Sequence, residues 1–146
     1  MIVSDALNTY NYAIDILKKK GYSIFLKDED EDYILYLEKG TVTFSAEEPL
    51  SLLSLVYLNE NNLNIHEDRI DFFMDNNTSF SIKEISNKGY NLSIENNSDW
   101  YNWIATNKEL TYYASSPLKV LGLILIIEVF GLDWQNFDIP LYLNEL

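Results

Sequence analysis

The chain repeats itself at an offset of 68 residues, and this repeat limits the folds open to it more than any other feature. Residues 21–60 align with residues 89–128 without a gap. The identical pairs are Gly21/Gly89, Tyr22/Tyr90, Tyr33/Tyr101, Thr43/Thr111, Ala46/Ala114, Pro49/Pro117, Leu50/Leu118, Leu53/Leu121, Leu55/Leu123 and Glu60/Glu128. Matched leucines arise easily by chance, but matched glycine, proline and tyrosine at one offset do not. We therefore predict two diverged copies of one unit. The predicted divisions are a single domain over 1–146, copies at 1–68 and 69–136, and a C-terminal tail at 137–146.

Each copy is predicted to run helix, three strands, helix. The predicted helices are 4–20 and 79–88 at the start of the copies, and 49–60 and 117–130 at their end. The predicted strands are 22–27, 32–38 and 41–45, then 90–95, 100–106 and 110–114. The expected fold class is therefore α+β with an antiparallel sheet. The sequence FSIKEI within 79–88 also alternates like a strand. Between the copies, the asparagine-rich segment 61–78 contains an apolar stretch at 70–74, where we expect a further helix or strand.

The predicted helix ends carry residues suited to them. The two matched glycines follow lysines and are expected to end helices in the left-handed conformation. The two matched prolines suit the first turn of a helix, where a missing amide hydrogen costs nothing. Ser45 and Ser116 are the candidate N-caps, although they are not equivalent positions. The closing helix at 117–130 is apolar nearly all round, which predicts that it is buried at the centre of the domain.

The charge of the chain is strongly acidic. The chain contains ten Lys and Arg residues and 23 Asp and Glu residues, which gives it a formal charge of −13. Direct nucleic-acid binding needs a basic patch, so this class is not expected. A basic protein partner suits the charge, because opposite potentials steer two proteins together. Solubility alone is the alternative explanation of the charge.

The sequence gives no sign of secretion or of membrane insertion. The chain has no cysteine, so it has neither a disulfide framework nor a thiolate zinc site. The longest apolar run, Val120–Ile127, is much shorter than the roughly 20 residues that span a bilayer. The amino terminus lacks the features of a secretory signal. We therefore expect a cytoplasmic protein that does not contact a membrane.

Motifs for catalysis and for cofactor or metal binding are missing from the sequence. His66 is the single histidine, and the chain has neither a G-x-S-x-G motif nor a phosphate-binding glycine loop. The D-x-D-x-D spacing from Asp28 lacks the glycine and glutamate of a calcium loop, since Tyr33 and Lys39 stand there. The matched pair Glu60 and Glu128 is interpreted as a structural bond present in each copy. We predict no enzyme activity, no cofactor and no metal site.

Residues that differ between the copies are the better candidates for function, because a requirement of the fold should appear in both. The first copy has the acidic run Asp28, Glu29, Asp30, Glu31 and Asp32, whereas the second has Asn96, Asn97, Ser98, Asp99 and Trp100. Trp100 and Trp103 replace Asp32 and Leu35, and tryptophan is common among interface anchors. We therefore predict partner binding by the acidic run, Trp100 and Trp103. The alternatives are a solvated hairpin turn for the acidic run and a core position for the tryptophans.

The sequence around the second closing helix resembles a known group of proteins. The residues that carry the resemblance are Ala114, Pro117, Leu118, Leu121, Gly122, Leu123, Glu128, Gly131 and Trp134. Together with this pattern, the size and the acidic charge of the chain are similar to those of the small acidic immunity proteins of bacterial polymorphic-toxin and contact-dependent inhibition systems. The resemblance implies a cytoplasmic protein that binds and neutralises one cognate basic toxin domain, such as a nuclease. The alternatives are a phage-type nucleic-acid mimic or host-enzyme inhibitor, and a carboxylate-dependent hydrolase with a deep cleft.

Overall fold

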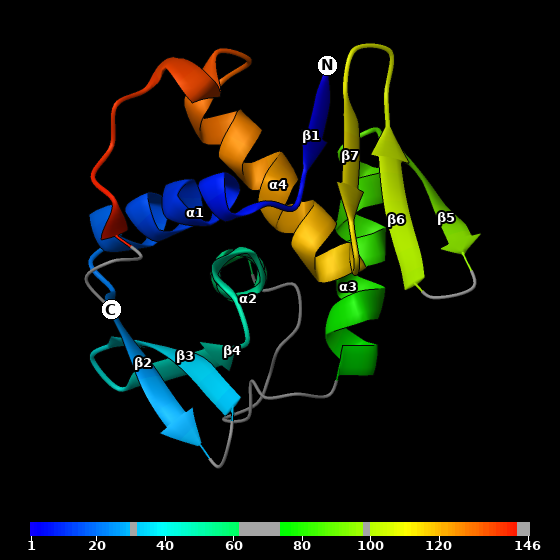
Figure 1. The fold of residues 1–146 in the computed structure, drawn as a ribbon. Coiled ribbons are helices and arrows are strands. Elements are labelled where there is room, and N and C mark those ends of the chain that lie inside the picture. Colours follow the sequence, from blue (N-terminus) through cyan, green and yellow to red (C-terminus); the bar gives the residue numbers. More distant parts are fainter. Residues whose placement is uncertain (30–31, 62–73, 98–99, 143–146) are drawn as a thin grey trace.

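The computed structural model describes residues 1–29, 32–61, 74–97 and 100–142. These residues form an α+β domain with four helices, a mixed four-stranded sheet and an antiparallel three-stranded sheet (Figure 1). In chain order the elements are β1 (Ile2–Ser4), α1 (Leu7–Lys19), β2 (Ser23–Glu29), β3 (Asp32–Lys39), β4 (Val42–Ala46), α2 (Pro49–Glu60), α3 (Met74–Asn87), β5 (Asn91–Asn97), β6 (Trp100–Thr106), β7 (Thr111–Ala114), α4 (Pro117–Phe130) and the 3-10 helix η1 (Trp134–Asn136). The predicted α+β class is confirmed.

The two halves of the chain have the same order of elements. A helix, three strands and a second helix follow one another in each, and β2 and β5, like α2 and α4, begin at positions 68 apart. The three repeated strands of each half form separate sheets, and β1 of the first half joins the sheet of the second, so the orders are β2-β3-β4 and β1-β7-β6-β5. The expectation of purely antiparallel pairing is corrected by β1, which pairs in parallel with β7. This strand was missed because three residues are too few to show the alternation of a strand.

Two predictions about helices need correction. The first helix was expected from residue 4, but α1 begins at Leu7, because the preceding residues extend alongside β7. The sequence FSIKEI is helical, and α3 begins earlier than the expected residue 79. The element expected within 61–78 lies outside the described residues, except where α3 begins at Met74.

Helix α4 lies buried at the centre of the core, as predicted. Its residues from Val120 to Ile127 are all buried, and it packs against α1, α2, α3 and the four-stranded sheet. Figure 1 shows it crossing the middle of the molecule, with α1 along one side and β7 beside its N-terminal end. In the described ranges, no helix is long and apolar enough to cross a membrane.

The two closing helices cross closely, and both halves contribute to the contact in the same way. The Ser54 hydroxyl of α2 donates a hydrogen bond to the Leu118 carbonyl of α4 at 2.6 Å. The residue equivalent to Ser54 in α4 is Gly122, where an added Cβ would lie 2.6 Å from the Leu50 carbonyl oxygen. Leu50 and Leu118 are themselves equivalent. The two helices are therefore related by an approximate two-fold axis at this crossing.

Bonds that close each half are also repeated. Lys20 Nζ lies 2.9 Å from Glu60 Oε1, and Lys88 Nζ lies 2.8 Å from Glu128 Oε2. The structural bond predicted for the matched glutamates is therefore present in both halves. Gly21 has a φ of 93° and Gly89 a φ of 92°, as expected for glycines that end α1 and α3.

The N-caps of the closing helices differ from the prediction in one half. Ser116 caps α4 as expected, because its Oγ accepts a hydrogen bond from the Lys119 amide at 3.2 Å. Ser45 is not the cap of α2. That role belongs to Glu48, whose Oε1 accepts from the Ser51 amide at 2.6 Å. Glu48 is the position equivalent to Ser116, so the cap position is shared although the residue type is not.

Candidate functional site

The acidic run predicted to bind a partner lies at the end of the first hairpin. Asp28 is exposed near the end of β2, and the Glu29 backbone pairs with the Asp32 backbone at the start of β3. The antiparallel ladder therefore brings three of the five acidic residues to one end of the small sheet. Asp30 and Glu31 lie outside the described residues, as do the side chains of Glu29 and Asp32.

The predicted tryptophans lie on the other sheet. Trp100 begins β6, where its backbone pairs with Asn97, and its side chain is outside the described residues. Trp103 is half-buried and packs against the core, as does its equivalent in the first half, Leu35. The tryptophans and Asp28 are therefore on different sheets, and these two sheets lie apart in Figure 1. Their role in partner binding stays a prediction.

An aromatic pair on the hairpin that carries the acidic run was missed by sequence reasoning. Phe25 on β2 is 37% exposed and stacks on Tyr36 of β3, with ring centroids 5.6 Å apart. The Lys27 ammonium lies 5.2 Å from the centroid of the Tyr36 ring. The equivalents of the two rings in the second half are Ser93 and Ile104. The pair is therefore another feature of one half alone, and comparing the two halves strand by strand would have found it.

A pocket of about 350 Å³ lies where the two halves meet, and we name it the interhelix pocket. It is formed at the N-terminal ends of α2 and α4, with Ile34 of β3 in its wall. Its apolar wall includes Ala46, Leu55 and Leu118, and several hydroxyl groups also face it. Its charged residues are Glu47, Glu48 and Lys119.

Glu48 is the unusual group in the interhelix pocket. Its residue is only 8% exposed, although a carboxylate is normally found in water. Burial raises the pKa of Glu48, and the negative charge of Asp5 raises it further, while the hydrogen bonds with Ser51 and the charge of Lys119 lower it in part. The net direction is upward. Glu48 nevertheless has a structural role, because it caps α2.

The lysine of the interhelix pocket is engaged elsewhere. Lys119 Nζ lies 3.2 Å from Asp5 Oδ2 and donates to Ser115 Oγ at 3.0 Å. Within the part of the chain that the structure describes, no lysine or arginine nitrogen lies within 4.0 Å of the Glu48 carboxylate. The pocket thus contains a buried carboxylate with a backbone hydrogen bond and no ion-pair partner.

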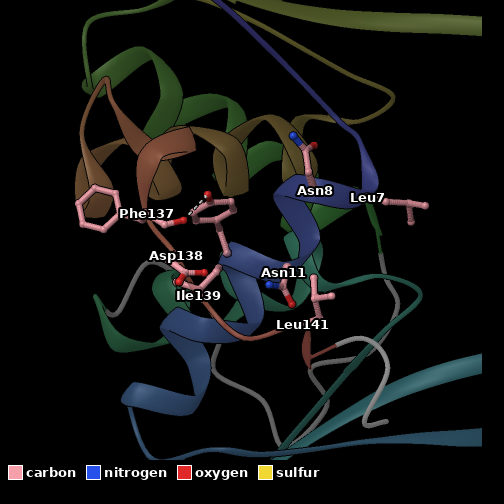
Figure 2. Close-up of a pocket in the computed structure, with 8 residues that line it drawn as sticks. Leu7, Asn8, Asn11, Phe137, Asp138, Ile139 and Leu141 are labelled. Carbon is pink, nitrogen blue, oxygen red and sulfur yellow. Dashed lines mark hydrogen bonds between the residues drawn. The ribbon is translucent and has the colours of Figure 1, made fainter.

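A second hollow, of about 400 Å³, lies between α1 and the C-terminal tail (Figure 2). Its rim includes the exposed side chains of Leu7, Phe137 and Leu141. The Asn11 side chain donates to the Pro140 carbonyl and accepts from the Tyr142 amide at 2.7 Å. A hydrogen bond of 3.3 Å also joins the Tyr12 hydroxyl to the Phe137 carbonyl. These polar groups hold the tail on α1, so they have a structural role in this hollow.

The described residues contain no group of three or more His, Cys, Asp or Glu side chains placed to hold a metal ion. His66 lies outside these residues. No family model, no curated protein and no solved structure matches the chain.

Proposed function

We propose that this chain is an immunity-type protein that binds a basic toxin domain in the cytoplasm and neutralises it. The observation that carries the proposal is the acidic end of the first hairpin. There, Asp28 is exposed near the end of β2, and the partly exposed Phe25 ring lies three residues earlier on the same strand, in a chain with a charge of −13. The sequence of the second half has a single acidic residue, Asp99, at the five equivalent positions. The repeated unit can therefore fold without the negative charge of the acidic run.

We also infer that the two halves arose as copies of one unit. Their common element order, their equivalent ion pairs and their equivalent cap positions support this inference. A duplicated scaffold needs only one set of stabilising residues in each copy. Residues outside that set can serve binding, and they include the acidic run and the aromatic pair of Phe25 and Tyr36.

Neutralisation would follow from charge and shape at the hairpin end. The active-site cleft of a nuclease is cationic, because it receives phosphates. A row of carboxylates on a strand end can occupy such a cleft, and the opposite potentials raise the rate of encounter. The apolar rings of Phe25 and Tyr36 would then bury against the rim of the cleft, where aromatic side chains commonly anchor interfaces.

The test uses the C-terminal domain of the protein encoded by the gene immediately upstream. We expect a toxic domain there, and we expect the purified chain to abolish its activity at a 1:1 ratio and to restore growth when the two are co-expressed. A chain with no effect on that domain's activity would overturn the proposal. A gene neighbourhood of phage functions, with inhibition of a host nucleic-acid enzyme, would replace it with the mimic hypothesis.

A further inference from the structure

The interhelix pocket is lined by equivalent positions of the two halves that carry different chemistry. At the cap position of α2 stands the carboxylate of Glu48, and at the cap position of α4 stands the hydroxyl of Ser116. The preceding pair is Glu47 and Ser115, and both line the pocket. Both cap residues have nearly the same backbone conformation, with φ of −152° and ψ of 163° and 157°. A serine therefore suffices for the cap, and the glutamates are an addition of the first half.

A buried carboxylate without a cation is costly unless something compensates its charge. The Ser51 amide satisfies one oxygen of Glu48, while Lys119 is paired with Asp5. Burial accordingly raises the pKa of Glu48, although the Ser51 hydrogen bonds and Lys119 lower it in part. The Ser51 hydrogen bond and the N-terminus of α2 compensate this charge in part, and a cation arriving from outside would supply the ion-pair partner. Glu47, exposed at the rim, adds a second negative charge that would attract it.

We propose that the interhelix pocket binds the guanidinium group of an arginine side chain that belongs to the basic partner. This inference rests on the proposed function. The volume of about 350 Å³ lies in the usual range of ligand pockets, roughly 300–1,000 Å³. Arginine fits the lining better than lysine, because its planar group is weakly hydrated and offers five donors to the carboxylate and the hydroxyls. Its aliphatic stem can pack on the apolar wall.

The interhelix pocket and the acidic hairpin end are close together along β3. Ile34, which lines the pocket, lies on β3 two residues after Asp32 at the hairpin end. Two residues of a strand span roughly 7 Å. One basic surface can therefore contact the carboxylates of the hairpin and place an arginine in the pocket at the same time.

The probe is N-acetyl-L-arginine amide, and the control probe is the citrulline compound, which has nearly the same shape without the charge. Each is titrated into ¹⁵N-labelled chain and followed by amide chemical shifts. We expect the arginine probe to shift the amides of Ser51, Ser116 and Lys119 with a dissociation constant of about 1 mM, and the citrulline probe to bind at least about tenfold more weakly. Equal binding of the two probes, or no binding of either, would overturn the proposal.

Two neutral variants connect the binding to Glu48. Glu48→Gln keeps an oxygen for the Ser51 amide, and Glu48→Ser copies the cap of the second half, so both are expected to fold. Both should lose at least about tenfold in affinity for the arginine probe, whereas Glu47→Gln, at the exposed rim, should lose less. Undiminished affinity in Glu48→Gln would contradict the assignment even if Glu48→Ser failed to fold.

The failure of this inference is distinguishable from that of the proposed function. Inhibition of the toxin domain by wild type and by Glu48→Gln alike, with no binding of the arginine probe, would refute the pocket alone. If the chain binds the arginine probe but inhibits no toxin domain, the proposed function is refuted. A toxin partner is then also refuted as the source of the arginine. A free guanidinium compound would then be the ligand.

Discussion

At the scale of single residues, equivalent positions perform one task with different chemistry. Glu48 caps α2 and Ser116 caps α4. Ser54 of α2 contacts the Leu118 carbonyl of α4, and the equivalent Gly122 of α4 lies against the Leu50 carbonyl of α2. Ser116 was predictable from its residue type. Glu48 was not, because glutamate is not a preferred cap residue, and a serine stood nearby at Ser45. Only the alignment of position 48 with position 116 indicates the cap.

Glu48 should make the stability of the chain depend on pH. Its pKa is raised in the folded state, so the folded protein holds the proton more tightly than the unfolded chain does. As the pH rises above the usual glutamate value, wild type should therefore lose stability relative to Glu48→Ser. Burial raises the pKa of Glu48 and the charge of Asp5 raises it further, whereas the hydrogen bonds with Ser51 and the charge of Lys119 lower it in part.

The measurement is the free energy of unfolding from urea melts of both proteins at pH 4 and at pH 7. The advantage of Glu48→Ser over wild type should be larger at pH 7. Glu47→Ser, which changes an exposed neighbour, is the control and should show the smaller change. If the free energy of unfolding of the wild type rises relative to that of Glu48→Ser as the pH rises, hydrogen bonding outweighs burial in setting the pKa of Glu48.

Gly122→Ala should destabilise the chain by about 1–3 kcal/mol, because the new Cβ would lie against the Leu50 backbone and force the helices apart. Ser54→Ala removes only the hydrogen bond to Leu118 and should cost about 0.5–1.5 kcal/mol. Denaturant melts of both variants measure these values. An increase in stability for Gly122→Ala, as alanine normally gives inside a helix, would mean that the crossing is looser than described.

At the scale of elements, the features that could be predicted are those with strong local signals. Both closing helices begin at the predicted prolines and end where predicted, because proline, apolar composition and length agree there. The strands were located to within a few residues by their β-branched and aromatic content. The parallel strand β1 and the early start of α3 have weaker local signals, since β1 depends on its pairing with β7.

The central position of α4 leads to a stability prediction. Leu121 is fully buried, so Leu121→Ala should cost roughly 2–5 kcal/mol from lost contacts and the cavity left behind. Val129 lies on the same helix and is 61% exposed, which makes Val129→Ala the matched control with a cost below about 1 kcal/mol. Equal losses for the two variants in urea melts would show that α4 is not the centre of the core.

At the scale of the whole molecule, the sequence indicates the sign of the surface charge but not the shape of the surface. The charge and the acidic run are visible in the sequence, and Asp28 is exposed as expected for a binding surface. The interhelix pocket was not predictable, because it forms only where the ends of α2 and α4 meet. The position of Trp103 on the core side follows from its equivalence to Leu35, a residue of the core.

The most direct test of the proposed binding surface is the association rate with the toxin domain encoded upstream, measured by stopped flow at several salt concentrations. Asp28→Asn/Asp30→Asn/Asp32→Asn should lower that rate by at least about tenfold at low ionic strength, and less as salt rises. The control variant Glu95→Gln/Glu109→Gln/Asp133→Asn removes the same charge from other exposed positions and should change the rate much less. Equal rates for the two variants would contradict binding through the hairpin end and leave the acidic run a role in solubility alone.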